Sequence, residues 1–141
     1  MLMDRDAIEL VIPHREPFLL VDRIIECEPG VSAVGELDVA DTMFWVPGHF
    51  PGHPVMPGVL IVEACAQVGA VALLSLEENR GRLALFAGID KVRFRRQVLP
   101  GETLRMRCEI VKRRGPVGFG VATAHVADEL ACSGELMFAI Q

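Results

Sequence analysis

The longest apolar stretch of the chain reads Val59-Leu60-Ile61-Val62-Glu63-Ala64-Cys65-Ala66-Gln67 and continues without another strongly polar residue to Leu74. Pro57 fits the first turn of a helix, where a missing N–H costs nothing, and Glu78-Asn79-Arg80-Gly81 ends it. The stretch is too short and too interrupted for a membrane span of about 20 apolar residues. A helix that is apolar on all sides is instead surrounded by protein. The sequence therefore predicts one buried central helix over Val59–Leu74.

Strands separated by Pro/Gly turns flank this helix. Asp4–Val11 favours a short helix with Asp4 as its cap. The strands that we expect are Phe18–Glu26, Val31–Val39, Leu83–Arg95, Thr103–Lys112, Gly118–Ala127 and Ala131–Ile140. Consecutive strands with tight turns and one helix predict an α+β fold, in which an antiparallel sheet packs on the helix. We expect residues 1–141 to form a single domain. Because the helix is apolar on more sides than one sheet covers, a second copy would supply the missing cover, and we expect a dimer.

Composition narrows the class of protein. The formal charge of −5 argues against a general nucleic-acid binder. The four cysteines form no CxxC pair, which favours buried thiols in a reducing compartment over disulfides or a zinc knuckle. The charged N-terminus is not typical of a signal peptide, and no segment predicts membrane insertion. These features together predict a soluble cytoplasmic protein.

Glu63 is the first candidate functional residue, because apolar residues surround it on the helix. Gln67, four residues on, shares its face and could hydrogen-bond it. A carboxylate held there is either paired or has a raised pKa, and both outcomes suit acid–base chemistry. A structural role for Glu63 is the alternative.

A stiff loop precedes the helix and reads Gly48-His49-Phe50-Pro51-Gly52-His53-Pro54. The Pro/Gly content forbids a helix, so His49 and His53 do not form a helical metal pair. A zinc site of His49, His53 and Glu63 is a weaker alternative, because no further ligand is evident. Gly58, at the start of the helix, offers an N–H that can polarise a carbonyl group. These parts suit proton abstraction beside a carbonyl with loss of a leaving group, and equally water attack on a thioester.

The chain resembles the 3-hydroxyacyl-acyl-carrier-protein dehydratases of fatty-acid synthesis over nearly its whole length. The resemblance rests on four segments, which are Pro13–Arg23, Gly48–Pro54, Met56–Ala64 and Phe86–Phe94. It implies the hotdog fold, in which a bent antiparallel sheet wraps a long central helix. It also implies a homodimer with shared sites, often a trimer of dimers, and no metal or organic cofactor.

The resemblance also implies roles for single residues. His49 matches the catalytic histidine, which takes the proton from C2, and Glu63 matches the catalytic glutamate of the opposite subunit, which helps the C3 hydroxyl leave as water. Gly58 matches the backbone N–H that faces the thioester carbonyl. His53 is then a residue that shapes the loop. A hotdog thioesterase, a dehydratase of a specialised polyene or polyketide route, and a non-catalytic acyl-binding subunit are the alternatives.

The expected partner is an acyl carrier protein that bears the 3-hydroxyacyl chain, and it is acidic. Alternating positions place Lys91, Arg93 and Arg95 on one face of a strand, with Arg96 beside them, and this patch would steer the carrier or form a solvated face. The residues expected to line the acyl tunnel are Phe50, Phe86, Ile89 and Val92. Two departures from the family pattern, Met43–Pro47 and the Asp128-Glu129-Leu130 hairpin, are expected to reshape the acyl pocket and a turn, respectively.

Overall fold

The central helix forms where the sequence predicts it. In the computed structural model, which describes residues 1–141, helix α2 spans Gly58–Leu74. Pro57 is the N-cap residue rather than part of the first turn, so the helix begins at Gly58. Every residue from Leu60 to Leu74 is buried except Glu63. The apolar run is therefore a core helix with one partly accessible carboxylate.

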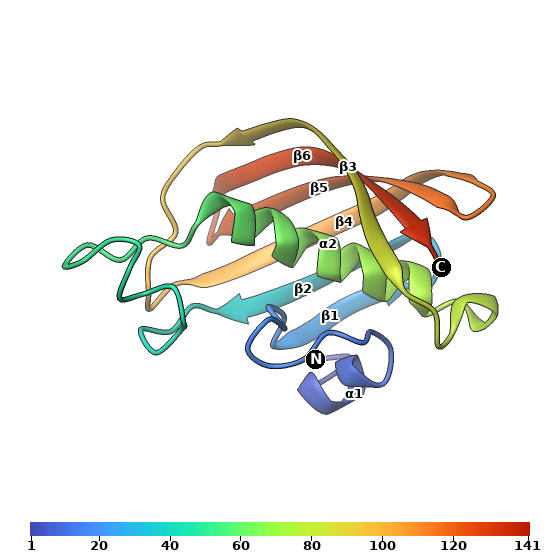
Figure 1. The fold of residues 1–141 in the computed structure, drawn as a ribbon, viewed down its shortest axis with the longest axis horizontal. Coiled ribbons are helices and arrows are strands. Elements are labelled where there is room, and N and C mark those ends of the chain that lie inside the picture. The colour runs from blue at the N-terminus through green and yellow to red at the C-terminus, as the bar shows by residue number, and fades with distance from the viewer.

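Six antiparallel strands form one sheet that curves around α2 (Figure 1). Their order across the sheet is β1-β2-β4-β5-β6-β3. The strands span Arg23–Glu28 (β1), Ser32–Asp38 (β2), Ala84–Phe94 (β3), Thr103–Arg114 (β4), Val117–Val126 (β5) and Glu129–Ile140 (β6). Helix α2 carries the chain across the sheet, so β3 forms the edge opposite β1. This arrangement confirms the α+β hotdog architecture.

The first strand is shorter than expected. It begins at Arg23 rather than at Phe18, because the backbone at Phe18 and Leu20 is bound to α2 instead of to a neighbouring strand. The Gln67 side chain accepts a hydrogen bond from the Leu20 N–H at 2.7 Å and donates one to the Phe18 carbonyl at 2.7 Å. A β-rich composition could not reveal this competing partner, which lies almost 50 positions away.

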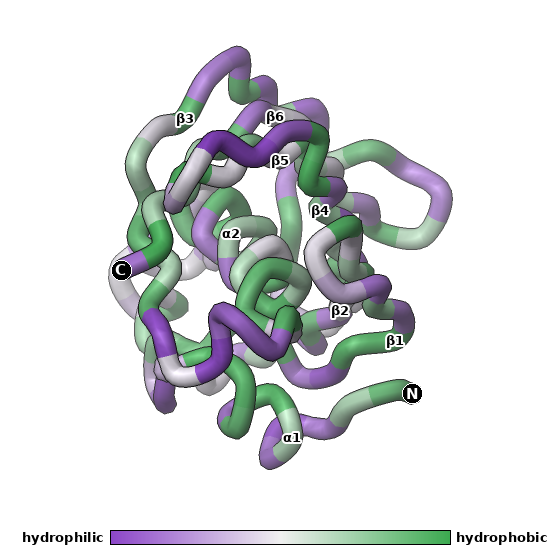
Figure 2. The backbone as a smooth tube through the Cα atoms, turned by 90° about the vertical axis from the view of Figure 1, so that its right-hand side faces the viewer, coloured by the Kyte–Doolittle hydropathy of each residue, from purple (hydrophilic) through white to green (hydrophobic).

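The N-terminal segment covers the side of α2 that the sheet leaves open. It starts with helix α1, Arg5–Glu9, which Asp4 caps by accepting a hydrogen bond from the Ala7 N–H at 2.9 Å. Figure 2 shows α2 between this segment and the curved sheet. One chain therefore buries α2 by itself, and the burial of the helix does not require the second copy that the sequence argument invoked.

The β3 edge of the sheet leaves apolar side chains exposed. Strand β3 pairs on one side only, with β6. Its side chains Leu85, Ile89 and Phe94 are about half exposed, at 45, 55 and 53%. Proteins usually cover or charge such an edge, because its free N–H and carbonyl groups can pair with another chain. The β3 edge, rather than the helix, is therefore where this chain leaves both free backbone groups and apolar side chains exposed.

Candidate active site

Backbone hydrogen bonds hold His49 in its loop. The His49 N–H donates to the Trp45 carbonyl at 3.0 Å, and its own carbonyl accepts from the Val55 N–H at 2.8 Å. Nδ1 of the ring lies 2.7 Å from the Val55 carbonyl oxygen. A carbonyl only accepts, so Nδ1 carries the hydrogen and Nε2 keeps the free lone pair. Nε2 is therefore the nitrogen that can take a proton from a substrate.

The rest of the loop is a tight turn beside this histidine. The N–H groups of Phe50 and His53 donate to each other's carbonyls at 3.0 and 2.8 Å, and Gly52 adopts a φ of 74° between them. The Phe50 ring stacks on the His49 ring with centroids 4.1 Å apart. His53 contributes through its backbone, while its side chain is exposed and makes no hydrogen bond.

Gly58 shares a cavity of about 560 Å³ with His49. The first N–H of a helix has no acceptor within that helix, and it lies at the positive end of the helix dipole. The ring of Phe94 covers Gly58 so closely that an added Cβ would lie 2.7 Å from Phe94 Cζ. The histidine, the helix start and this aromatic ring thus form one half of a candidate site.

Glu63 lies on another face of α2, next to Gln67. Glu63 Oε2 accepts a hydrogen bond from Gln67 Nε2 at 3.0 Å, and 18% of its side chain is exposed. Burial raises the pKa of Glu63 above its usual value, and the hydrogen bond from Gln67 only partly opposes this. A carboxyl group in this environment keeps its proton more readily and can act as a general acid.

His14 is a second polar residue at this position. His14 Nε2 lies 3.7 Å from Glu63 Oε2, and the buried Nδ1 has no hydrogen-bond partner. Burial, and after it the nearby charge of Arg15, lowers the pKa of His14. The imidazole is therefore held neutral beside the carboxyl group.

The two candidate catalytic residues line different cavities of the single chain. The cavity at Glu63 has a volume of about 160 Å³, and none of its lining residues also lines the cavity at His49. Its walls are His14, Ala66 and Ala70, together with Ala84, Leu85, Phe86 and Phe138. His49, His53 and Glu63 do not form a metal-binding group. Within the single chain, the zinc alternative therefore lacks a set of converging ligands.

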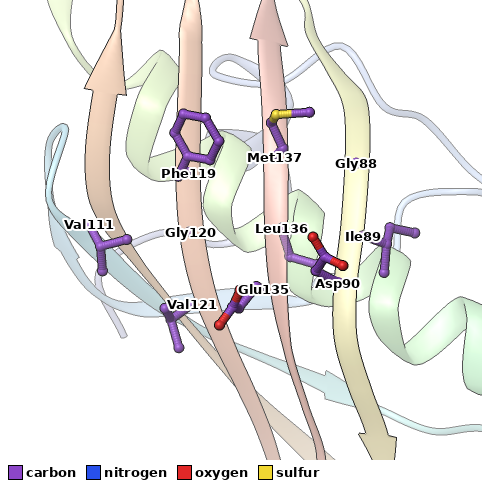
Figure 3. Close-up of a pocket in the computed structure, with 10 residues that line it drawn as sticks. All are labelled: Gly88, Ile89, Asp90, Val111, Phe119, Gly120, Val121, Glu135, Leu136 and Met137. Carbon is purple, nitrogen blue, oxygen red and sulfur yellow. The ribbon is translucent and has the colours of Figure 1, made fainter.

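The structure separates the residues expected in an acyl tunnel. Phe86 lines the cavity at Glu63, and Phe50 stacks on His49. Val92 lines a small void near Cys65. Ile89 borders a cavity of about 270 Å³ on the face of the sheet away from α2 (Figure 3). Phe86 and Phe50 thus accompany the two halves of the site, whereas Ile89 lies apart from both.

The basic residues near β3 do not alternate as expected. Lys91 adopts a φ of 52°, and the pairing register with β6 shifts between Asp90 and Arg93, so Lys91, Arg93 and Arg95 do not follow one regular strand face. Arg95 and Arg96 line the cavity at His49. Lys91 pairs with Glu135, and Arg96 with Glu102 and Glu129, whereas Arg93 and Arg95 form no ion pair.

The two departures from the family pattern have different consequences. Trp45 is buried, its Nε1 lacks a hydrogen-bond partner, and its carbonyl holds the His49 N–H. It lines a third cavity, with Leu19 and Leu37, rather than either half of the site. In the last hairpin Ala127 takes a φ of 50°, a conformation that glycine adopts more easily.

Sequence reasoning missed two residues of the site. His14 was part of a segment that carried the resemblance, but its contact with Glu63 spans 49 positions, and no local pattern reports such a distance. Phe94 lies half exposed over Gly58 and lines the cavity at His49, and no local pattern connects it with either residue. An aromatic residue at the end of an edge strand was the only available signal.

Sequence comparisons give consistent results. Residues 12–135 match the FabA-like domain family. The protein of Moorella thermoacetica named 3-hydroxyacyl-[acyl-carrier-protein] dehydratase FabZ is 61% identical over 98% of this chain and 96% of its own length. Proteins of the same name from Desulforamulus reducens and Staphylococcus haemolyticus are 59% and 56% identical, each over 99% of this chain and 98% and 97% of their own lengths.

Structural comparisons support the fold. The dehydratase heterocomplex ApeI:P from Xenorhabdus doucetiae superposes with a TM-score of 0.81 at 17% identity, over 95% of this chain and 90% of that one. An uncharacterized protein from Pyrococcus horikoshii gives a TM-score of 0.72 at 16% identity, over 94% and 92% of the two chains. At these identities the likeness concerns the fold alone.

Proposed function

Because this chain belongs to the family of 3-hydroxyacyl-[acyl-carrier-protein] dehydratases named FabZ, we propose that it removes water from (3R)-3-hydroxyacyl-[acyl-carrier-protein] in fatty-acid biosynthesis. The product is the trans-2-enoyl thioester, which makes the enzyme a hydro-lyase. The proposal rests on two groups of this chain, a histidine, His49, whose Nε2 is free, and a largely buried carboxyl group, Glu63, whose pKa is raised.

The proposed reaction needs one base, one acid and one carbonyl polariser. Nε2 of His49 takes the C2 proton, and the electron pair of that C–H bond forms the C2–C3 double bond. Protonated Glu63 gives its proton to the C3 hydroxyl, which leaves as water. The Gly58 N–H binds the thioester oxygen, where negative charge develops as the proton leaves. His49 then holds one more proton and Glu63 one fewer, and a proton returned from His49 to Glu63 resets the enzyme.

We propose that the two halves meet across a homodimer. In the single chain His49 and Glu63 line cavities that share no residue, so one chain alone does not present both groups to one substrate. The open β3 edge, with its exposed apolar side chains, supports pairing with a second copy. A trimer of such dimers is the larger assembly proposed.

The carrier protein would dock beside the cavity at His49. Arg95 opens onto this cavity and has no carboxylate partner in its own chain, which supports a role in attracting an acidic carrier. Arg95→Glu is expected to raise KM for a carrier-bound substrate severalfold while changing turnover of a small thioester little. Equal losses on both substrates would contradict docking.

We place the proposed activity in the cytoplasm and in one domain formed by residues 1–141. None of the helices of this chain has the length and apolar character needed to cross a bilayer.

Substitution of each proposed catalytic group tests the chemistry. His49→Ala and Glu63→Gln are each expected to lower the rate of enoyl thioester formation about a hundredfold or more, the usual size of an acid–base contribution. Enoyl absorbance measures the rate, and circular dichroism checks the fold. His125→Leu, on β5, is the matched control and should keep full activity. Wild-type turnover in either active-site variant would overturn its assigned role.

Mixing the two inactive variants tests the shared site. After joint unfolding and refolding, about half of the dimers are mixed, and each mixed dimer has one site with both native groups, so about a quarter of wild-type activity should return. A site within one chain would recover nothing.

A thioesterase is the competing activity on the same substrate class. Release of free thiol from the acyl thioester, followed with a disulfide dye, distinguishes the two reactions. Thiol release without enoyl formation would overturn the dehydratase proposal.

A further inference from the structure

The carboxyl group of Glu63 is held unequally at its two oxygens. Gln67 Nε2 donates to Oε2 at 3.0 Å, and His14 Nε2 lies 3.7 Å from the same oxygen. Oε1 has neither contact. Because both nitrogens approach Oε2, the proton of the neutral acid is better placed on Oε1, and Oε1 is the atom left to meet a substrate.

We propose that His14 is a positioning residue which, together with Gln67, holds Oε2 of Glu63 and directs the acid proton on Oε1 towards the C3 hydroxyl of the substrate. This inference rests on the proposed role of Glu63 as the general acid. It adds a third side chain to the site, from a segment that lies far from both catalytic residues in the sequence.

The tautomer of His14 follows from its surroundings. Its Nδ1 is buried without a partner, whereas its Nε2 faces a carboxylate oxygen. A hydrogen on Nδ1 would be a buried donor without an acceptor, which is unfavourable. It would also turn the Nε2 lone pair towards the lone pairs of Oε2. The hydrogen therefore belongs on Nε2, where the 3.7 Å separation can shorten to a hydrogen bond, as catalytic contacts often do when substrate binds.

The backbone around His14 is fixed on both sides. The Arg15 guanidinium donates to the carbonyls of Ile12, His14 and Glu9 at 2.9, 2.8 and 3.0 Å. Further along, Gln67 binds the Phe18 carbonyl and the Leu20 N–H. Gln67 thus ties the segment of His14 to α2 and contacts Glu63 with the same side chain. A residue so anchored can orient another without large motions of its own.

No other ionisable group lines this cavity. The lining residues from α2 are Glu63, Ala66 and Ala70, and those from β3 and β6 are Ala84, Leu85, Phe86 and Phe138. Burial, and after it the nearby charge of Arg15, lowers the pKa of His14 and keeps the imidazole neutral. Neutral His14 can donate a hydrogen bond to the Glu63 carboxylate that remains after proton transfer. A positively charged imidazole would lower the pKa of Glu63 further, and the carboxyl group would then lose its proton too easily.

The kinetic test compares two substitutions of similar length. His14→Leu removes the donor, and His14→Gln keeps an N–H close to the position of Nε2. The Leu variant is expected to lower kcat about tenfold with little change in KM, and to move one limb of the pH profile of kcat/KM to higher pH, because an unsupported carboxylate binds its proton more tightly. The Gln variant should recover most of the rate and the wild-type profile. Equal losses in both variants, or none in the Leu variant, would overturn the proposal.

A measurement on the native enzyme does not depend on how the variants fold. Long-range ¹⁵N–¹H spectra of the histidine rings, assigned with His14→Gln, should show His14 protonated on Nε2 at neutral pH. Protonation on Nδ1 would overturn the proposal. The outcome is separable from that of the proposed function: an active Glu63→Gln variant would refute the acid role itself, whereas an inactive Glu63→Gln beside an unaffected His14→Leu would refute only the positioning.

Discussion

The two halves of the site are held by different parts of the chain. His49 sits in a loop whose fixed points are backbone groups, with the Trp45 carbonyl and both polar groups of the Val55 backbone as its partners. Glu63 sits on helix α2, and its carboxyl group meets two side chains, Gln67 in a hydrogen bond and His14 at 3.7 Å. The difference predicts that substituting a neighbouring side chain leaves His49, the proposed base, in position, whereas substituting Gln67 or His14 displaces Glu63, the proposed acid.

The largest expected effect comes from Gln67→Leu. This change leaves the buried Leu20 N–H and the partly buried Phe18 carbonyl without partners, and an unpaired buried group costs about 1–3 kcal/mol. We expect the free energy of unfolding to fall by about 3 kcal/mol, and activity to fall with it, because Glu63 loses its donor. Urea unfolding at fixed protein concentration measures the loss. An unchanged urea midpoint would show that the Glu63 half does not depend on Gln67, and would contradict the difference drawn between the two halves.

Gly58→Ala probes the half that contains His49. The new Cβ would meet the Phe94 ring at 2.7 and 2.8 Å, and the half-exposed ring can turn aside. We expect little change in stability but about a tenfold lower kcat/KM, equivalent to about 1.4 kcal/mol, because the displaced ring enters the cavity beside His49. Adding Phe94→Ala should restore most of the rate. If the double variant stays as slow as the single one, the ring is not the cause.

Glu63→Gln should stabilise the protein while it removes activity. The pKa of Glu63 is raised in the folded state above its ordinary 4.5, so the unfolded chain loses the proton first as pH rises. Stability is therefore lost as pH rises from the unfolded pKa through the folded one. Gln carries no charge, so the variant should exceed the wild type in unfolding free energy at pH 7 and match it below pH 4.5. A gap that widens on acidification would contradict this linkage.

The smallest effect is expected away from both halves. Ala127→Gly relieves a φ of 50° in the β5–β6 turn, and should raise the free energy of unfolding by about 0.5–1 kcal/mol with unchanged kinetics. Thermal unfolding and the enoyl assay measure the two quantities. Because Ala127 contacts neither half, a change in kcat here would show that activity follows global stability, and would weaken conclusions drawn from Gln67→Leu.

The sequence predicted the elements well and the contacts between them less well. The apolar run around Glu63 gave helix α2, since every face of it carried the same signal, and Gln67 was correctly expected to hydrogen-bond Glu63. The first strand was placed five residues too early, because the bonds from Gln67 to Phe18 and Leu20 are non-local. The regular alternation expected for Lys91, Arg93 and Arg95 was wrong, because a register shift interrupts β3.

For the candidate site too, local patterns could be predicted from the sequence, whereas contacts between distant segments could not. His49, Gly58 and Glu63 stand in distinctive local patterns, and these residues could be proposed at once. His14 could not be connected to Glu63, because that contact exists only after the N-terminal segment folds onto α2. The separation of the two cavities is likewise a property of the folded chain.

The strand order also sets a sequence of events in time. The ribosome synthesises β3 before β6, and β6 is the only strand of the same chain that pairs with β3. Ala84 can therefore pair only after Ile140 has been synthesised. One part of the wall of the Glu63 cavity consists of Phe86 on β3 and Phe138 on β6, which are partners in that late pairing. The cavity at Glu63 therefore closes only when the C-terminal strand has been synthesised and has paired. A nascent chain without β6 leaves an apolar strand exposed to chaperones and other chains.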